Sequence, residues 1–337
     1  MTQIEVSARQ LADKCIEKLV RVGVKEPDAA FVADVLVHAD LRGVESHGTM
    51  RLEHYVKTIE CGGIVPNPDI RITAVGPSII VVDGGHGLGH VIAGKAMEAA
   101  VRLAGQSGVA IVSVTNSSHC GALSFYVNMA AACGMIGMMM TNTDKLVTPF
   151  GGAQPYFGTN PLAYAIPAGR HKPIILDMAT STVAYGKILH ALENNKRIPL
   201  DWAVNGGGEP TDNPGEVAAL LPFGGAKGYG LGMMVDVFSG ILTGSPFGPH
   251  IPAMYGDCSE KRGLGHFMLV MDPSRLMPIE QFHSRVDQMI DELHALRPAP
   301  GFAAVQLPGE PEERLEAYRL EHGIPLSASV YRYLFAQ

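Results

Sequence analysis

A strand, a polar loop, a helix and a second strand follow one another in the middle of the chain, and this succession restricts the fold most. Residues 109–114 are an apolar stretch of strand length, a polar loop follows at 116–122, and residues 123–132 have helical apolar spacing. A further apolar stretch at 135–141 again has the length of a strand. Strands that alternate with helices are typical of an α/β layer. The sequence therefore predicts an α/β fold built around this segment.

The first third of the chain differs from this α/β segment, because its apolar residues recur at helical spacing only. Ser7 and Gln10 form a capping box, which predicts a helix start. Pro27 suits the first position of a second helix, and Gly43 suits the left-handed position that ends it. The Gly- and Pro-rich loop 61–68 then marks a domain boundary.

After this boundary the apolar period changes to that of strands. Residues 70–75 and 78–82 are predicted to pair around Gly76 and Pro77. Further strands are predicted at 162–166, 174–176 and 266–271, and helices at 91–104, 183–192, 228–242, 279–296 and 312–320. At 337 residues, the chain fits two domains of about 150 residues each.

The polar loop after the first central strand carries His119, and a second polar turn upstream could be its partner. A histidine in such a loop can exchange protons near neutral pH, although one held only by backbone hydrogen bonds is an equal alternative when it stands alone. The upstream turn supplies Ser46, His47 and Arg51. The Arg51 guanidinium can clamp a carboxylate with two hydrogen bonds, and the Ser46 hydroxyl can orient a reacting oxygen. Together the two segments predict a site for a small carboxylate.

Two glycine-rich segments look like phosphate-binding loops but lack the required spacing. Residues 83–90 follow a predicted strand and open a helix, yet no register gives G-x-G-x-x-G, and no acidic residue follows about 20 positions on. We therefore expect a tight strand-to-helix turn there. Residues 224–228 lack the P-loop spacing and its Ser or Thr.

A third group of polar residues is typical of a cofactor site. Residues 177–181 follow a buried strand, and their small side chains would let a ligand approach the backbone amides. Asp177 capping the helix that follows is the alternative. Lys227 stands at the start of an apolar helix, where the helix dipole disfavours a cation, so an anionic ligand is expected nearby. Asp236 inside that helix is interpreted as structural.

Charge and hydropathy exclude several classes of function. The net charge is −7 and Lys and Arg form no cluster, which argues against nucleic acid as a partner. The apolar run 228–242 is shorter than the ~18 residues of a membrane span and contains Asp236.

His86 and His90 are four residues apart, but without a third ligand nearby they predict no metal site.

The cysteines show no pairing pattern. They are odd in number and have no C-x-x-C spacing: Cys15, Cys61, Cys120, Cys133 and Cys258. We interpret all five as free thiols in a reducing compartment, which predicts a cytoplasmic protein.

Five ordered motifs, spread over nearly the whole chain, resemble the malate/L-lactate dehydrogenase family of the second type, which is unrelated to the Rossmann-type lactate dehydrogenases. They are Ser46-His47-Gly48, Asn116-Ser117-Ser118-His119, Gly158-Thr159-Asn160-Pro161-Leu162-Ala163, Asp177-Met178-Ala179-Thr180-Ser181 and Lys227-Gly228-Tyr229-Gly230. Within the family the chain is most similar to the ureidoglycolate dehydrogenase branch. That similarity lies in Leu221-Pro222, Ala299-Pro300-Gly301-Phe302 and Pro308-Gly309-Glu310.

The resemblance implies an architecture and a cofactor. The cofactor domain would be a non-Rossmann α/β sandwich formed by residues 69–277, which would explain the missing fingerprint. A mainly helical domain would combine residues 1–68 with residues 278–337. The cofactor would be NAD, with NADP as the alternative, and the protein would be a homodimer with its sites near the interface.

The resemblance also implies roles for individual residues. His119 would be the general acid/base, with Ser46, His47 and Arg51 near the substrate. Thr159 and Asn160 are further expected substrate contacts. The cofactor would be lined by Thr143, Asp177, Met178, Ala179, Lys227, Gly309, Glu310 and Pro311. Position 143 is Thr where the similar branch has Ser.

The expected reaction is hydride transfer between a nicotinamide and a small 2-hydroxy acid of the ureidoglycolate, malate or lactate type. One alternative is an NADPH-dependent reductase of cyclic imino acids such as Δ1-piperideine-2-carboxylate, or of 2,3-diketo-gulonate. A non-catalytic small-molecule binding protein is the alternative from another class.

Overall fold

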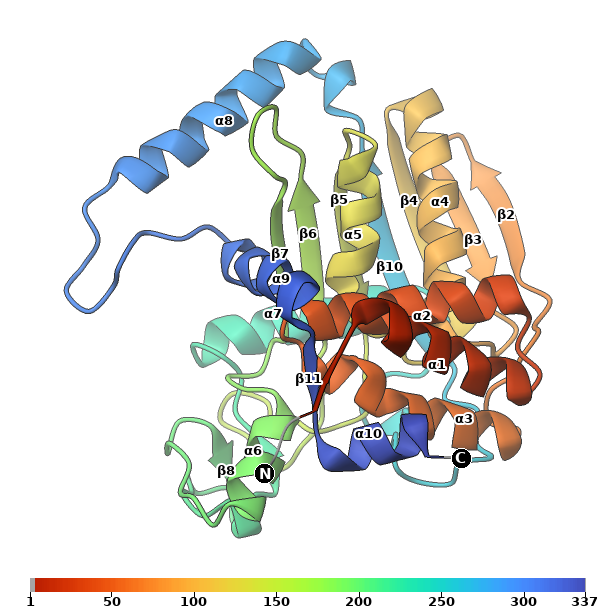
Figure 1. Ribbon diagram of the computed structural model, residues 1–337, viewed down its shortest axis with the longest axis vertical. Helices are drawn as coiled ribbons and strands as arrows, with labels where there is room; N and C mark the ends of the chain where they lie inside the picture. The colour runs from red at the N-terminus through yellow and green to blue at the C-terminus, as the bar shows by residue number, and fades with distance from the viewer. Residues whose placement is uncertain (1–3, 337) are drawn as a thin grey trace.

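A seven-stranded mixed sheet lies at the centre of the computed structural model, which describes residues 4–336 (Figure 1). The strands lie in the order β2-β3-β4-β10-β5-β6-β7. Only β3 and β4 pair in parallel; the other neighbours are antiparallel. Their bounds are β2 Arg71–Gly76, β3 Ile79–Asp83, β4 Val109–Ser117, β5 Ile136–Thr141, β6 Leu162–Ile166, β7 Ile174–Met178 and β10 Leu264–Met271. The predicted α/β class is confirmed.

Helices surround this sheet and form a second layer below it. Their bounds are α1 Ala8–Arg21, α2 Glu26–Leu41, α3 Leu52–Glu60, α4 Gly89–Ser107, α5 Leu123–Ala132, α6 Tyr185–Glu193, α7 Ala226–Asp236, α8 Ile279–Ala295, α9 Glu310–His322 and α10 Ala328–Phe335. Two short strand pairs, β1 Ile4–Val6 with β11 Ile324–Leu326 and β8 Ala203–Val204 with β9 Ala219–Leu220, complete the fold.

The local start and stop signals act as the sequence predicts. Ser7 and Gln10 form the capping box of α1. Gly43 follows the C-cap of α2 with a φ of 76°. Pro27 stands one position later than predicted, because α2 already begins at Glu26. The predicted helix 228–242 is α7 followed by a π-helical turn, Val237–Ile241.

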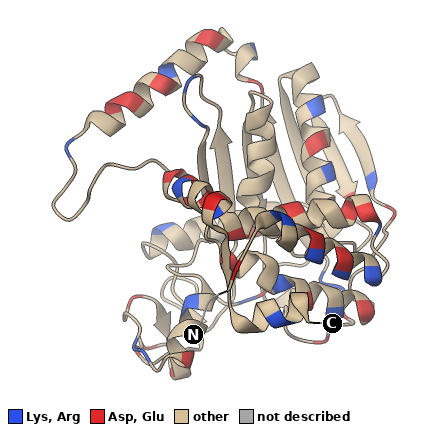
Figure 2. Ribbon diagram, in the orientation of Figure 1, with Lys and Arg blue, Asp and Glu red and all other residues tan. Residues whose placement is uncertain are grey.

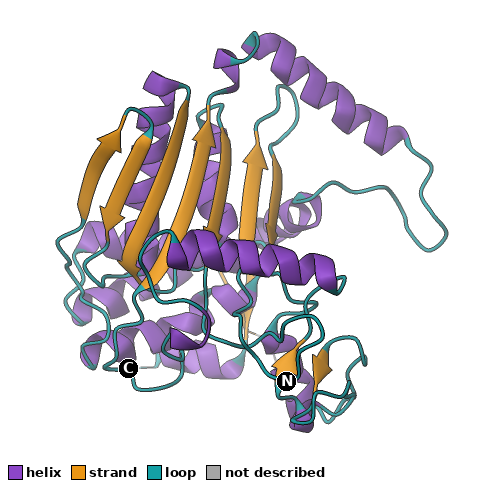
Figure 3. Ribbon diagram, turned by 180° about the vertical axis from the view of Figure 1, so that it is seen from behind, coloured by secondary structure: helices purple, strands orange, loops and turns teal. Residues whose placement is uncertain are grey.

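The main core lies between the sheet and two helices. α4 and α5 cover one face of the sheet (Figure 1), where Met97 and Val127 pack with Val112 and Met268. From the opposite face α7 and the π-helical turn contact β5 and β10 (Figure 3). The central strands and the loops at their ends are therefore held from both sides.

A second core joins the two ends of the chain. α1, α2, α3 and α10 bury Leu19, Leu36, Tyr55 and Leu334 together. The β1–β11 pair adds backbone hydrogen bonds between the amino-terminal and carboxyl-terminal regions. α8 lies apart from this cluster and packs near β7, and the chain between α8 and α9 projects from the body (Figure 1).

Charged residues are spread over the helices. Both signs occur along α1, α3 and α4, whereas α2 carries only acidic residues and α5 carries no charge; acidic positions recur on α8 and α9 (Figure 2). Within residues 4–336, no helix is both long enough and apolar enough to cross a membrane.

The prediction that all five cysteines are free is wrong. Cys61, which caps α3, forms a disulfide with Cys258, and their Cα atoms are 5.7 Å apart. Because 197 residues separate them, no local spacing signals the pair. Cys15 and Cys120 are buried free thiols, and Cys133 is an exposed one. Cysteine usage therefore no longer supports a reducing compartment.

Candidate active site

The loop that carries His119 is fixed by the glycine-rich turn before α4. The Ser118 hydroxyl accepts a hydrogen bond from the Gly89 amide at 2.8 Å and donates one to the Gly87 carbonyl at 2.9 Å. A Cβ on Gly89 would collide with the Ser118 carbonyl, so only glycine permits this approach. The predicted strand-to-helix turn is confirmed, and it supports the histidine loop.

One ring nitrogen of His119 is bound within the protein. Its Nδ1 lies 2.6 Å from the hydroxyl of Tyr55 on α3 and 3.3 Å from the amide nitrogen of Gly121. Burial, with the nearby His47 and Arg51, holds the pKa of His119 well below its usual value, so the ring is neutral at pH 7. Burial raises the pKa of Tyr55, whose hydroxyl stays protonated. Nε2 is therefore the nitrogen left for a ligand.

The predicted polar turn that supplies Ser46, His47 and Arg51 consists of two short 3₁₀ turns, Glu45–His47 and Thr49–Arg51. It is anchored by buried Asp40, whose carboxylate accepts from the Thr49 amide at 2.9 Å and the Thr49 hydroxyl at 2.7 Å. Burial raises the pKa of Asp40 to about 6, against the lowering effect of these two bonds. A Cβ on Gly48 would collide with the same carboxylate, which accounts for the glycine there.

Helix α9, in the carboxyl-terminal region, contacts this turn from outside. Arg319 donates to the Asp40 carbonyl and pairs with Glu45 at 2.6 Å. Arg42 is the buried C-cap of α2 and pairs with Glu316 at 2.9 Å. Residues near both ends of the chain thus determine where the turn lies.

The structure brings the two predicted segments together. The His47 and His119 rings stack with their centroids 5.4 Å apart. The Ser46 hydroxyl lies 2.9 Å from Nδ1 of His47, and burial, with Arg51 nearby, lowers the pKa of His47 to about 4. Two neutral imidazoles and a hydroxyl therefore share one site.

Arg51 is oriented at the rim of this site. Its Nε donates to the Ser46 carbonyl at 2.6 Å, and its Nη1 donates to the hydroxyl of Tyr255. Its guanidinium carbon lies 5.8 Å from the Tyr255 ring, and that tyrosine is 71% exposed. The guanidinium is thus held in place next to solvent.

A small pocket opens beside His119, and most of its lining was not predicted from the sequence, Tyr55 and Arg262 included. Its lining is His54, Tyr55, Thr58, Gly63, Ile64, Ser118, His119 and Arg262. Tyr55 lies four residues after Arg51, at helical spacing, and this signal could have found it. Arg262 belongs to no motif, and only the fold brings it here.

Three predicted site residues form a second cluster after β5. The Thr159 amide donates to the Thr143 hydroxyl at 2.9 Å, and the Thr143 amide donates to the Asn160 side chain at 3.1 Å. Asn160 is fully buried and donates to the Gly232 carbonyl on α7 at 3.0 Å. Its amide joins this loop to α7, where it also meets Asp236 at 3.4 Å.

Asp236 has the structural role that its position in the apolar helix suggested. Besides the Asn160 amide, its carboxylate accepts from the Gly248 amide at 3.0 Å. Burial raises its pKa to about 6.

Asp177 does not cap the helix that follows it, which corrects that alternative. It lies in β7, and its carboxylate accepts from the Ser124 amide at 2.8 Å, in the first turn of α5. Its neighbours Met178 and Ala179 are partly exposed, and the Phe223 amide donates to the Thr180 carbonyl at 3.1 Å. The end of β7 therefore adjoins the loop that leads into α7.

At the start of α7, Lys227 is exposed and the preceding Gly225 has a φ of 65°. Among the residues that the structure describes, Lys227 forms no ion pair. The helix N-terminus and this ammonium group together suit an anion.

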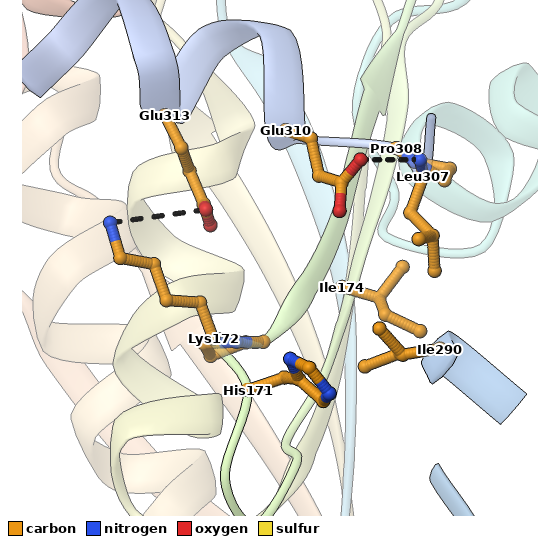
Figure 4. A pocket seen from close by; sticks show the side chains of 9 residues that line it. His171, Lys172, Ile174, Ile290, Leu307, Pro308, Glu310 and Glu313 are labelled. Carbon is orange, nitrogen blue, oxygen red and sulfur yellow. Dashed lines mark hydrogen bonds and ion pairs between the residues drawn. The ribbon is translucent and has the colours of Figure 1, made fainter. Parts of the chain in front are cut away.

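The segment 309–311 lies beside β7 at the start of α9. Gly309 has a φ of 96°, and a Cβ there would press on the Ile175 carbonyl. The Glu310 carboxylate accepts from the Leu307 amide at 3.0 Å and lies 2.6 Å from Nε2 of His294. Next to it is a pocket of about 180 Å³ (Figure 4). Its lining is His171, Lys172, Pro173, Ile174, Ile290, Leu307, Pro308, Glu310 and Glu313.

The two histidines considered as metal ligands are separated by the turn. His86 has a φ of 60°, whereas His90 is fully buried on α4 against the Tyr55 ring. Across the described residues, no group of three or more His, Cys, Asp or Glu side chains is placed to hold a metal ion.

The chain matches, over residues 6–335, the sequence model of the family described as malate/L-lactate dehydrogenase. It is 41% identical to the ureidoglycolate dehydrogenase (NAD(+)) of Escherichia coli K12, covering 99% of this chain and 95% of that protein. It is 42% identical to the malate dehydrogenase of Pyrococcus horikoshii, covering 97% and 92%. The structure of sulfolactate dehydrogenase from Methanocaldococcus jannaschii is similar with a TM-score of 0.93, at 37% identity and 98% and 95% coverage. The chain therefore belongs to the malate/L-lactate dehydrogenase family.

Proposed function

We propose that this protein is a nicotinamide-dependent dehydrogenase that oxidises a small 2-hydroxy acid, with His119 as the general acid/base. Its relatives are named for ureidoglycolate, malate and sulfolactate, each of which is a 2-hydroxy acid. The observation that carries the proposal is the contact between Tyr55 and Nδ1 of His119, because it leaves Nε2 for the substrate.

The proton step follows from the state of the ring. In the tautomer that carries its proton on Nδ1 and donates it to the Tyr55 hydroxyl, the neutral imidazole has its lone pair on Nε2, where it can accept the substrate hydroxyl proton. A bound nicotinamide would supply the hydride acceptor. A positioned base of this kind is worth on the order of 10²- to 10⁴-fold in rate. Arg51 would hold the substrate carboxylate, and Ser46 and His47 lie where they can contact the same molecule.

The residues expected to hold the cofactor fit a dinucleotide. Lys227 and the start of α7 offer a cation and backbone amides for phosphates. Asp177, Met178 and Ala179 at the end of β7 adjoin the loop into α7, and Thr143 lies at the end of β5. NAD is the cofactor that we propose, with NADP as the alternative.

We also propose a homodimer. The sheet face that α7 crosses exposes apolar residues, with Ile79 at 42% and Val81 at 38%. Ile241 and Leu242, after α7, are 54% and 59% exposed. Such a patch suits a subunit interface, and the molar mass from light scattering tests it. We also propose a cytoplasmic location, although the Cys61–Cys258 disulfide removes the support that cysteine usage gave it.

A substrate panel tests the function. Initial rates with NAD and NADP should be measured on ureidoglycolate, malate, lactate and sulfolactate, and in the reverse direction on 2-oxo acids, cyclic imino acids and 2,3-diketo-gulonate. We expect a nicotinamide absorbance change with at least one 2-hydroxy acid. Reduction of a cyclic imine or diketo-gulonate alone would replace our proposal by that reaction. No change with any compound would favour a non-catalytic binding protein.

A further inference from the structure

We propose that Arg262 binds a second acidic or carbonyl-bearing group of the substrate, so that the enzyme prefers 2-hydroxy acids with such a group to those with a plain alkyl chain. The inference rests on the proposed function and deepens it, because it names the substrate feature that this site selects.

Arg262 presents a buried cation to the pocket beside His119. Its side chain is only 9% exposed, and it lines the same pocket as Tyr55 and His119. Its Nε donates to the Pro252 carbonyl at 3.0 Å, and its Nη2 pairs with Asp144. Within residues 4–336, Nη1 has no hydrogen-bond partner. A guanidinium held on two sides with a third nitrogen left over is arranged to donate to a ligand.

Arg51 is a second guanidinium near the same histidine, and it comes from a different segment. It is held by the Ser46 carbonyl and Tyr255, whereas Arg262 is held by the Pro252 carbonyl and Asp144. Both cations lie close enough to lower the pKa of His119. A substrate with one carboxylate needs one of them. A substrate with two polar ends can use both.

A purely structural role for Arg262 makes a different prediction. The ion pair with Asp144 could simply hold the loop that contains Tyr255, and losing it would then affect all substrates alike. A recognition role predicts a loss confined to substrates with the second group. The ratio of kcat/KM between malate and lactate separates these roles, because the two differ only in a carboxylate on the carbon next to C2.

The experiment compares wild type with Arg262→Gln and Arg262→Lys on both acids. In the wild type, kcat/KM for malate should exceed that for lactate. In Arg262→Gln it should fall at least about tenfold for malate, the size of a lost charge-assisted hydrogen bond, and less than about threefold for lactate. Arg262→Lys keeps the positive charge but lacks the planar guanidinium with its paired N–H donors. Its malate-to-lactate ratio of kcat/KM should therefore lie between those of the wild type and Arg262→Gln. Lys261→Gln removes a neighbouring exposed charge and should leave the ratio unchanged.

Three results would overturn the inference. One is a wild type that prefers lactate. The second is a ratio that stays unchanged in both Arg262 variants with both activities retained, and the third is a ratio that stays unchanged because both activities fall by the same factor. The wild-type preference is measured whether or not a variant folds, and thermal melting identifies a variant that does not. A wild type that oxidises neither these acids nor ureidoglycolate would instead refute the proposed function.

Discussion

The hydroxyl of Tyr55 lies 2.6 Å from Nδ1 of His119 and so joins α3 to the loop after β4. If this contact orients the ring, Tyr55→Phe should lower kcat about 2- to 10-fold, as expected for one lost hydrogen bond. KM and the affinity for NADH should change little, because the pocket keeps its shape. Steady-state kinetics check this, with Tyr318→Phe on exposed α9 as the control. A kcat of Tyr55→Phe equal to that of the wild type would show that the contact between Tyr55 and His119 does not contribute to turnover.

His119→Ala should reduce kcat by roughly 10²- to 10⁴-fold, because it removes the imidazole that Tyr55 contacts at Nδ1 and that we propose as the proton acceptor. NADH binding, followed by fluorescence, should persist. His250→Ala, which removes an exposed histidine, provides the control and should keep normal turnover. Wild-type turnover in His119→Ala would refute the assignment of the base.

Arg51→Lys should raise KM for the 2-hydroxy acid about tenfold, because lysine cannot hold a carboxylate with two parallel hydrogen bonds. The loss should be similar for malate and lactate, since both carry the carboxylate on C1. Arg314→Lys on the exposed side of α9 serves as the matched variant. Unchanged kinetics would remove Arg51 from the substrate site.

The protein should lose stability as the pH falls below about 6.5. Burial lowers the pKa of His90 to about 3 and that of His266 to about 4. Below pH 6.5, the approximate pKa of histidine in the unfolded chain, the unfolded chain therefore binds protons at these two residues and the folded chain does not. Asp40 and Asp236 oppose this, because their pKa values are raised to about 6, so folding takes up protons there.

The histidines outnumber these carboxylates, since His38, His47 and His54 are also lowered, to about 3, 4 and 4. We thus expect the melting temperature to fall between pH 7.5 and pH 5. His90→Leu should make this fall less steep, because it removes one of the histidines whose pKa burial lowers. Leucine should be tolerated there, because neither ring nitrogen of His90 has a hydrogen-bond partner among the described residues. A melting temperature that stays constant or rises would contradict the prediction.

Loss of the Cys61–Cys258 disulfide should lower the free energy of unfolding by about 2–4 kcal/mol, because the bond constrains a long loop of the unfolded chain. Cys61→Ser measured by chemical denaturation tests this, and Cys133→Ser is the control at an exposed free thiol. Thiol titration of the denatured protein should find three thiols before reduction and five after it. Five thiols without reductant would show that the bond is not formed.

Local structure was largely predictable from the sequence. Helix starts, helix ends and strand periods depend on neighbouring residues, so the capping box at Ser7, the stop at Gly43 and the bounds of α5 were all predicted. The loop of His119 and the turn of Arg51 were also found, because polar residues between periodic segments stand out. The five ordered motifs were enough to indicate the family.

The sequence by itself thus determined the order of elements, the family and the two polar segments that meet at the site. Only the tertiary structure decided what surrounds them: Tyr55 on Nδ1 of His119, Arg262 in the pocket, and the bond between Cys61 and Cys258. The physical reason is that periodicity and capping act over a few residues. Contacts such as these depend on how the two layers pack, which joins residues 64 to 197 positions apart.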